Sequence, residues 1–584
     1  MEIKSVEEIL KCAGIGLPTL NVLVPNVDNY STLLMQPHGD IEVDDQGVRS
    51  FDRILATTQF SQFLSNAVEA QADLVITPEY AMPWDVLLGA IQDGVKPSRG
   101  KLWVLGCESI KLSELETVKT EMSPYATVIY ESLEMDNERF LGPLAYVFVA
   151  PALAADAEDR LIVLCQFKTN PMGDADHFEV NRLLCGSNVY QFGNVSGQEI
   201  KLVSLICSDA FEFLDQQART VYDRGLVIHI QLNQKPRQEQ FRLYRDRLLR
   251  FNGDATELIC LNWACNIQLR NDGNETAWNN IAGSAWYLKP DKFDSRDETL
   301  SVNHKRGLYY TWLEKLYVHA LFFNYIPASY LINATKVAHV GVAAPLSRRR
   351  GPQLSKSSVW NTDTESWEEQ ECLEDGFSNI VGEAGDASTN IKDISDLNPF
   401  IAERILALCS GKVGTRVDWY FVNQLDSCVI DASEIIFRVT FCQDSEPKVC
   451  DFRIGRLKRC RRLWNILQDS ANLPPALTDF TGGFSFDWIS QSPNQNAISE
   501  QGARATVIYM GEDVTIDQVD AVKKTLEELL HRGSRDPDKS IEARQRLAVW
   551  YRNDDSEIVV HNPHTYAQID MTGDRSAVDI GRTE

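Results

Sequence analysis

Three apolar runs of this chain each end in a reactive side chain, and this pattern constrains the fold more than any other feature of the sequence. The reactive side chains are Glu79, Lys168 and Cys207, and each directly follows a short, predominantly apolar run. Runs of this length and composition predict buried β-strands. Because reactive groups in α/β sheets gather beyond the carboxyl ends of strands, the pattern predicts an α/β fold with a shared site at one edge.

Together, the three residue types predict nucleophilic chemistry. A thiol attacks as its thiolate, so a nearby carboxylate that takes its proton activates it. A lysine ammonium stabilises negative charge that develops on a substrate, and the backbone N–H of Ser208 supplies a second donor. This set suits attack on an amide, a nitrile or a related carbon–nitrogen bond through a thioester-type intermediate. Taken singly, each residue has a structural alternative, because buried cysteines are common and Glu79 with Lys168 can form a plain ion pair.

The order of these residues resembles a known family. Glu, Lys and Cys each end a strand, Pro78 precedes the glutamate, and Asp209 lies two residues after the cysteine. Over roughly residues 10–340, this pattern is similar to the carbon–nitrogen hydrolase (nitrilase) superfamily. The resemblance implies a four-layer α-β-β-α sandwich. The other segments that carry it are an early strand at 20–24, a helix at 51–70, and strands at 103–108, 225–230, 257–263 and 282–286.

The resemblance also implies a second glutamate that orients the lysine and takes part in proton transfer. The matching residue is Glu179. Two segments depart from the family pattern: residues 169–178 differ from the usual lysine loop, and residues 210–213 lack the common Arg-Phe-Pro-Glu run. These departures leave the substrate subfamily open.

Several side chains at or just past the strand ends are candidates for contacting a substrate. For each of them the alternative is a structural role, since aromatic residues at such positions are as often core residues and a single histidine is more often a satisfied structural residue. With Ser208, the candidates are Tyr80, Trp84, His229, Asn233 and Trp263.

Composition excludes several classes of function. The chain has 57 basic and 83 acidic residues, a formal charge of -26, which disfavours general binding to nucleic acid or anionic membrane. The basic clusters at 348–350 and 456–462 are predicted to be solvated. Thirteen scattered cysteines and an amino terminus without an apolar signal core predict a cytoplasmic protein, and no apolar run predicts a membrane span. The cysteine and histidine spacing predicts no metal, and no cofactor is expected.

The chain is predicted to have three parts. Residues 1–345 form the nitrilase-like domain, 346–397 an acidic linker and 398–584 an α+β C-terminal domain of unknown function. No phosphate-binding loop is found in the C-terminal part, which disfavours a fused ATP-using synthetase. Its predicted strands are 417–422, 434–442, 448–454 and 505–510, and its predicted helices are 401–408, 456–468, 515–530 and 539–551.

The leading hypothesis is therefore a cytoplasmic hydrolase of a small, amide-like molecule. In it, Glu79 is the general base, Lys168 stabilises the tetrahedral intermediate, Cys207 is the nucleophile and Glu179 supports proton transfer. The alternative is a non-hydrolytic ligand-sensing or assembly module whose C-terminal region binds a protein partner. The family resemblance implies homo-oligomers in either case. The identity of the substrate does not follow from the sequence.

Overall fold

The computed structural model divides the chain into two compact units, Met1–Asp294 with Val302–Glu374, and Ser295–Ser301 with Asp375–Glu584. Each unit is described by itself. The residues described are 1–25, 29–134, 136, 138–152, 158–173, 178–193, 200–221, 224–234, 239–250, 256–271, 273–278, 283–288, 297–313, 318–337, 352–373, 405–413, 447–469, 473–487, 494–512 and 514–561.

A nine-stranded mixed sheet positions two of the residues predicted to be catalytic, Glu79 on β5 and Lys168 directly after β11. Its central strands β2, β5 and β6 are parallel, and the strands to either side are mostly antiparallel to their neighbours. In spatial order the strands are β23 (Ser366–Glu369), β22 (Gln353–Asn361), β21 (Ala328–Thr335), β2 (Asn29–Gln36), β5 (Leu74–Met82), β6 (Leu102–Cys107), β10 (Pro143–Ala150), β11 (Arg160–Phe167) and β8 (Thr127–Tyr130).

An eight-stranded sheet carries the predicted nucleophile. Its central strands β13, β14 and β15 are parallel, so their carboxyl ends meet at one edge. In spatial order the strands are β1 (Glu2–Ser5), β12 (Asn188–Phe192), β13 (Lys201–Ile206), β14 (Gly225–Ile230), β15 (Glu257–Leu261), β18 (Ala285–Leu288), β20 (Val318–Phe323) and β19 (Leu308–Leu313).

Smaller elements complete the first unit. A four-stranded sheet has the order β17 (Asn274–Trp278), β16 (Ile267–Asn271), β3 (Asp40–Asp44) and β4 (Gly47–Ser50), and β7 (Ile110–Lys111) pairs with β9 (Phe140–Leu141). The helices are α1 (Val6–Cys12), α2 (Arg53–Glu69), α3 (Trp84–Gln92), α4 (Leu112–Met122), α5 (Asp209–Glu212), α6 (Asp215–Val221) and α7 (Glu239–Arg250). The residues of α8 (Asp297–Lys305) belong to this unit only from Val302 onward.

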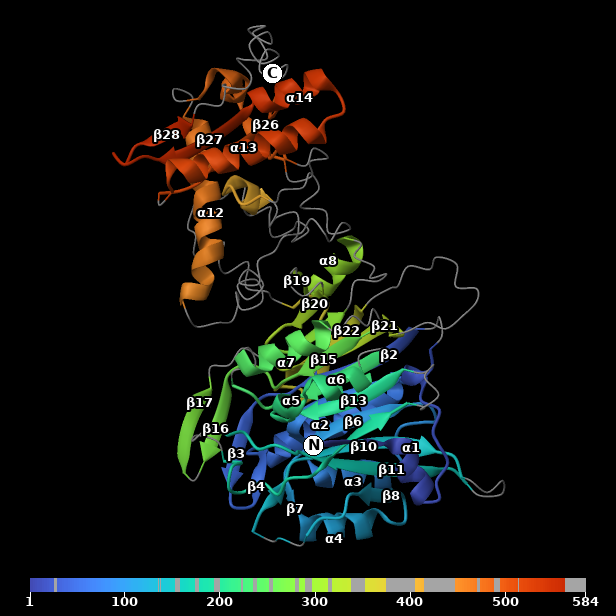
Figure 1. Ribbon diagram of the computed structural model, residues 1–584. Coiled ribbons are helices and arrows are strands. Elements are labelled where there is room, and N and C mark those ends of the chain that lie inside the picture. Colours follow the sequence, from blue (N-terminus) through green and yellow to red (C-terminus); the bar gives the residue numbers. More distant parts are fainter. Residues whose placement is uncertain are drawn as a thin grey trace. The chain divides into compact units, whose positions relative to one another are not determined.

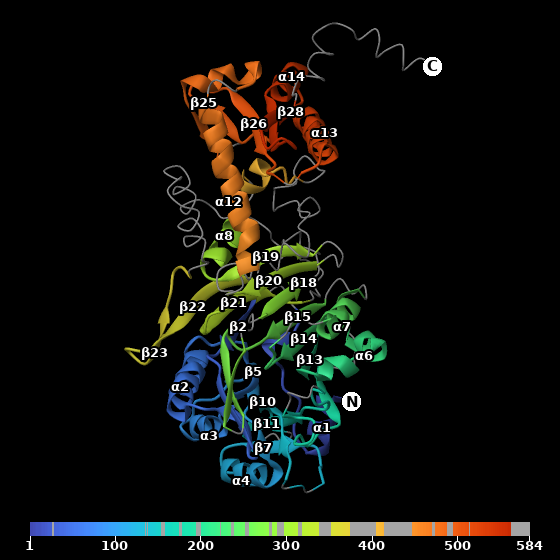
Figure 2. The same cartoon turned by 90° about the vertical axis from the view of Figure 1, so that its left-hand side faces the viewer.

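The two large sheets are each covered by helices on one face (Figures 1 and 2). Phe63 of α2 and Leu115 of α4 share a buried apolar cluster with strand residues of the nine-stranded sheet. Leu248 of α7 shares another with strand residues of the eight-stranded sheet. Figure 2 shows α2 and α3 on one side of the strands and α6 and α7 on the other.

The other faces of the two sheets contact each other. The rings of Tyr146 on β10 and Phe192 on β12 lie with centroids 4.8 Å apart. The Gln166 side chain on β11 donates a hydrogen bond to the backbone oxygen of Ser204 on β13 at 3.0 Å. These contacts fix the nine-stranded sheet against the strand that ends at Cys207.

The second unit is built on a five-stranded sheet with a buried cluster on each face. Leu463 of α12 packs with Val507 on one face, and Leu526 of α13 packs with Ile508 on the other. The strands are β24 (Phe484–Phe486), β25 (Ala497–Ser499), β26 (Arg504–Tyr509), β27 (Leu547–Arg552) and β28 (Ile558–His561), and the helices are α12 (Pro447–Gln468), the 3-10 helix η6 (Pro475–Gly482), α13 (Ile516–Gly533) and α14 (Pro537–Gln545). Because α13 and α14 connect the parallel strands β26 and β27, this part of the unit is a βαβ arrangement.

Two expectations for the first unit are corrected. The early strand predicted at 20–24 is a short 3-10 helix, η1 (Asn21–Leu23). The first strand of the nine-stranded sheet along the chain is β2. The linker predicted from 346 contains β22 and β23, so the first unit continues to Glu374 instead of ending at 345. Trp360 and Trp367 pair across these strands with ring centroids 5.3 Å apart, which gives the polar segment an apolar anchor.

Two further corrections concern the second unit. Residues 448–454 were predicted as a strand but belong to α12. The helix begins at Pro447, and proline is favoured at the first position of a helix because the N–H that it lacks would have no partner within the helix there. Residues 547–551 were predicted as the end of a helix but form β27 between two other strands. A short apolar run without a polar face does not distinguish the two forms. The predicted strands 417–422 and 434–442 lie outside the described residues.

Other elements agree with the sequence. The predicted helix 51–70 is α2, and Thr515 caps α13 as its side chain accepts a hydrogen bond from the Gln518 N–H. Among the described residues, no helix combines the length and the apolar character needed to cross a membrane.

Candidate active site

The chain around Glu79 is shaped by an irregularity near the end of β5. The register between β5 and β6 shifts after Thr77, and Tyr80 has a positive φ of 56°. Gly106 on β6 permits this, because a Cβ there would lie 2.0 Å from the Pro78 carbonyl oxygen. The irregularity leaves the Glu79 side chain buried, with only 2% of the residue exposed. Its Oε2 accepts a hydrogen bond from the Leu232 N–H at 2.7 Å.

Lys168 connects two carboxylates. It is the first residue after β11, and its backbone N–H donates to Gly142 at 2.9 Å, which fixes the start of the loop. Its Nζ donates to Glu79 Oε1 at 2.8 Å and to Glu179 Oε1 at 2.7 Å. The structure thus brings together three of the four residues predicted to be catalytic.

Glu179 is held by groups from two other segments. The hydroxyl of Tyr80 donates to its Oε1 at 2.7 Å, and the Met172 N–H donates to its Oε2 at 2.9 Å. Tyr80 was predicted to contact substrate; in the structure its hydroxyl is hydrogen-bonded to Glu179. Every oxygen of the Glu179 carboxylate has a donor, which fixes the carboxylate as a support for Lys168.

Burial and mutual charge set the protonation of this cluster. Burial raises the pKa of Glu79 to about 7, although attraction to Lys168 opposes the rise. Burial by itself would lower the pKa of Lys168, but Glu179 and Glu79 raise it well above its usual value. Burial would raise the pKa of Glu179, but Lys168 and the fixed donors lower it. The lysine therefore stays charged at neutral pH, while Glu79 can exchange a proton.

Cys207 follows β13 directly and lies in the left-handed region, with φ of 41°. Its N–H donates to the Ile230 oxygen at 2.8 Å, which ties the turn to β14. Burial raises the pKa of the Cys207 thiol well above its usual value, and the charges of Glu79, Lys168 and Glu179 also act on it. The thiol is thus protonated at rest, within the electrostatic influence of a carboxyl group whose own pKa is about 7.

Asp209 links the loop after Lys168 to the turn after Cys207. Its Oδ1 accepts hydrogen bonds from the Thr169 N–H at 2.8 Å, the Thr169 hydroxyl at 2.9 Å and the Asn170 N–H at 3.0 Å. Its Oδ2 accepts from the Ile206 N–H at 3.3 Å. Burial raises the pKa of Asp209 to about 6. One carboxylate therefore sets the distance between the loops that carry the lysine and the cysteine.

Ser208 takes part through both its side chain and its backbone. Its hydroxyl donates to the Asn170 oxygen, and the Asn170 side chain donates back to the Ser208 oxygen at 3.1 Å. Within the described part of the chain, no acceptor is found for the Ser208 N–H. This amide adjoins the predicted nucleophile, Cys207, and is available to an oxyanion that develops there.

The remaining candidates for substrate contact occupy different places. The Trp263 indole donates to the Glu79 backbone oxygen at 2.7 Å, and a ring nitrogen of His229 lies 2.9 Å from the Cys207 oxygen. Trp84 donates from its indole to the Glu108 oxygen at 3.0 Å, and the Asn233 backbone is held by the Asn262 side chain at 3.1 and 2.9 Å. Trp263 and His229 thus support the backbone of the site residues.

Sequence reasoning missed three contributors. The first is the Leu232 N–H, which donates to the Glu79 carboxylate. It is a backbone group, so no pattern of side chains in the sequence indicates it. The side chain of Asn262 accepts a hydrogen bond from the Asn233 N–H, and the hydroxyl of Tyr244 lies 2.6 Å from His229. Asn262 ends an apolar run just as Cys207 does, so the same signal could have identified it; Tyr244 lies inside a helix, where no such signal exists.

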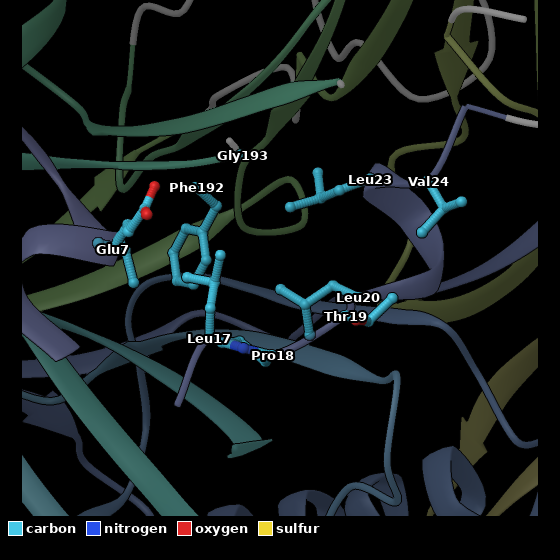
Figure 3. A pocket seen from close by; sticks show the side chains of 10 residues that line it. Glu7, Leu17, Pro18, Thr19, Leu20, Leu23, Val24, Phe192 and Gly193 are labelled. Carbon is cyan, nitrogen blue, oxygen red and sulfur yellow. The ribbon is translucent and has the colours of Figure 1, made fainter. Parts of the chain in front are cut away.

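One cavity in the first unit lies elsewhere. It has a volume of about 160 Å³ and is bounded by α1, η1 and the end of β12 (Figure 3). Its walls are mostly apolar; among the residues labelled in Figure 3 are Leu17, Leu20, Leu23 and Phe192, with Glu7 at its side. Because β12 is antiparallel to β13, this cavity adjoins the edge of the sheet opposite to Cys207.

No group of three or more His, Cys, Asp or Glu side chains in the described residues is placed to hold a metal ion. The acidic pair at the site is instead bridged by the Lys168 ammonium. A thiol, a carboxyl group with a pKa of about 7, a fixed cation and an amide donor are the groups required for nucleophilic attack on an acyl carbon.

Comparisons with known proteins give distant likenesses. No family model and no curated protein matches the chain. Among solved structures, the glutamine-dependent NAD+ synthetase of Acinetobacter baumannii matches with 13% identity over 55% of this chain and 49% of its own, at a TM-score of 0.31. An amidase from Nesterenkonia sp. matches with 14% identity over 45% and 84%, at 0.26. The CN-hydrolase superfamily protein XC1258 of Xanthomonas campestris matches with 12% identity over 44% and 82%, also at 0.26. These values are too low to carry a reaction over to this chain.

Proposed function

We propose that this chain is a cysteine-dependent hydrolase of the carbon–nitrogen hydrolase (nitrilase) superfamily, acting on a non-peptide carbon–nitrogen bond of an amide or related small molecule. The observation that carries the proposal is the buried Lys168 ammonium, which donates to two carboxylates within the electrostatic reach of Cys207. A purely structural ion pair needs one carboxylate and no thiol. Each sheet has helices on its outer face, as the four-layer α-β-β-α sandwich of that superfamily requires.

The first half of the reaction forms a thioester. Glu79 takes the proton of the Cys207 thiol as the sulfur attacks the acyl carbon, and the carbon–oxygen double bond becomes an oxyanion. Lys168 Nζ and the Ser208 N–H stabilise that oxyanion. When the intermediate collapses, Glu79 returns the proton to the leaving nitrogen, and ammonia or an amine departs.

The second half regenerates the enzyme. Glu79 takes a proton from a water molecule, whose oxygen attacks the thioester carbon. The new oxyanion meets the same two donors, the carbon–sulfur bond breaks, and the sulfur recovers its proton from Glu79. A carboxylic acid is released. Each half needs Glu79 once as a base and once as an acid, and a pKa of about 7 suits both tasks near neutral pH. In both halves, Glu179 holds Lys168 in place.

A second candidate function is supported by the enclosure of the site. Glu79, Lys168 and Cys207 expose only 2%, 1% and 1% of their surface. A site so closed is compatible with a ligand-sensing or assembly module that no longer turns over. In that function the C-terminal unit would bind a protein partner. Under either function we propose a cytoplasmic homo-oligomer without a cofactor.

The test is turnover together with covalent capture. The purified full chain is incubated with a panel of small aliphatic amides while ammonia release is followed, and separately with acrylamide before peptide mass mapping. We expect ammonia release that Cys207→Ala abolishes and an adduct on Cys207. The exposed Cys12 serves as the internal control for simple thiol accessibility. Labelling of Cys12 without labelling of Cys207, and no ammonia release, would favour the second candidate.

A further inference from the structure

A buried histidine lies beneath the turn that carries Cys207. His229 is on β14, and its side chain faces α7, where its ring meets Tyr244 edge-on with centroids 5.0 Å apart. Its Nε2 lies 2.9 Å from the Cys207 backbone oxygen, and its Nδ1 lies 2.6 Å from the Tyr244 hydroxyl. None of the proposed chemical steps uses either side chain.

The contacts fix which ring nitrogen carries the proton. A carbonyl oxygen only accepts hydrogen bonds, so Nε2 must donate to Cys207. Nδ1 is then an acceptor, and the Tyr244 hydroxyl donates to it. Burial lowers the pKa of His229 to about 3, so the ring is neutral. The Gln231 side-chain nitrogen lies near the ring as well, 2.8 Å from Nδ1 and 3.1 Å from Nε2.

The Cys207 oxygen and the Ser208 N–H belong to one peptide group. A peptide group is planar and almost always trans, so its C=O and N–H point in opposite directions. The oxygen is held on the α7 side by His229 and by the Ala210 N–H at 3.2 Å. The Ser208 N–H is therefore directed away from α7, toward the side where the other sheet places Lys168. A donor on the oxygen also polarises the N–H at the other end of the group.

We propose that His229, held in one tautomer by Tyr244, is a positioning residue that orients and polarises the Ser208 N–H for the oxyanion. The inference rests on the proposed function, because it assigns a role within that reaction. It accounts for a polar chain of three groups beside the apolar cluster that β14 and α7 share. It also accounts for the left-handed conformation of Cys207, since a residue other than glycine needs fixed partners to stay at a φ of 41°.

Two reactions of the same sulfur separate this role from a general structural one. Acyl transfer from p-nitrophenyl acetate passes through an oxyanion, whereas alkylation by iodoacetamide displaces iodide without one. We expect His229→Leu to slow the burst of p-nitrophenol about tenfold, a fraction of the about 10²–10³-fold loss known for removing an oxyanion donor. The alkylation rate of Cys207 should stay within about twofold. Tyr244→Phe should slow the burst less, because the His229 ring stays in place and loses only the hydroxyl that favours the tautomer with its proton on Nε2.

Matched variants complete the test. His229→Gln keeps an amide donor near the Nε2 position and should recover most of the burst rate. Tyr330 on β21 has another buried hydroxyl, which donates to the Asn324 oxygen at 3.3 Å. Tyr330→Phe removes it and should leave the burst rate and the alkylation rate unchanged. Equal slowing of acylation and alkylation in His229→Leu, or no change in either, would overturn the inference. A wild-type chain that is alkylated at Cys207 but shows no burst and no ammonia release would overturn the proposed function itself, and the inference with it.

Discussion

Two buried cysteines, one in each unit, differ in the groups that surround them. Burial raises the pKa of Cys207 in the first unit well above its usual value, and the pKa of Cys460 in the second unit is raised too, by its hydrogen bond to Cys409 and by burial. Around Cys460, the polar neighbours are a second thiol and, through that thiol, the Asn496 amide at 3.2 Å from Cys409. Around Cys207, the charges that act on the thiol are one ammonium and three carboxylates. Both cysteines are buried, but only the surroundings of Cys207 supply a base and a cation.

The largest expected effect separates the two settings directly. Cys207→Ala should reduce amide turnover by more than about 10³-fold, as for other nucleophiles that act with a partner base. Its circular dichroism spectrum should match that of the wild type, because the fold does not depend on the thiol. Cys460→Ala should leave turnover unchanged. Ammonia release and circular dichroism measure the two properties, and turnover that persists in Cys207→Ala would remove the distinction.

Lys168→Met tests the cation. Removing it leaves two buried carboxylates without a cation, so we expect a loss of about 3–5 kcal/mol in the free energy of unfolding. Turnover should fall by about 10²–10³-fold because one oxyanion donor is gone. The partly exposed Lys119 pairs with Glu116 at 3.8 Å, and Lys119→Met should change neither property by a comparable amount. A stable, active Lys168→Met would show that the cluster is a plain ion pair.

The pH dependence tests the base. Glu79 must be ionised to accept the thiol proton, and burial raises its pKa to about 7. Below pH 7, kcat/KM should therefore fall about tenfold for each unit of pH, and above pH 7 it should level off. Rates on a small amide from pH 5 to 9 measure the profile. Rates that stay constant down to pH 5 would assign the base to another group.

Tyr80→Phe should have a smaller effect. It removes the hydroxyl that donates to Glu179 at 2.7 Å but leaves the ring in place. We expect kcat to fall about tenfold while KM changes little, because Lys168 would be held less firmly in the transition state. Steady-state kinetics on the same amide separates the two constants. A rise in KM alone would return Tyr80 to the substrate-contacting role predicted from the sequence.

The smallest effect is expected in the second unit. Cys460→Ala removes one buried sulfur, and we expect the free energy of unfolding to fall by about 1 kcal/mol. Urea unfolding followed by tryptophan fluorescence measures the change. Cys12→Ala at an exposed position is the control. If Cys460→Ala lowered turnover as well, the second unit would be coupled to the chemistry.

The sequence was informative where side chains alone define a feature. The strands β5, β11 and β13 follow from apolar runs, although β5 continues past Glu79 to Met82. The order of the reactive residues on them led to Glu179, which the structure places 2.7 Å from Lys168. Features that depend on backbone geometry were out of reach. The turn of His229 toward α7, opposite to the side where a substrate contact was predicted, depends on the pleat of β14 and on its neighbours.

The ends of the first unit show the same limit. The segment that forms β22 and β23 is polar, with few apolar anchors, and was predicted as a linker. Its strands are stabilised by pairing with β21 and by the contact of two tryptophans across β22 and β23, and strand composition alone predicts neither. In the second unit, the apolar run of β27 carried no periodic signal that separates strand from helix.

The buried charges around Cys207 do not cancel. Lys168 contributes one positive charge, whereas Glu79, Glu179 and Asp209 contribute three negative charges when all are ionised. A buried negative surplus favours the uptake of protons, and burial indeed raises the pKa of Glu79 to about 7 and that of Asp209 to about 6. A ligand with its own negative charge would enlarge the surplus, whereas a neutral or cationic one would not. The electrostatics of this cluster therefore select against anionic ligands before the shape of any pocket has an effect.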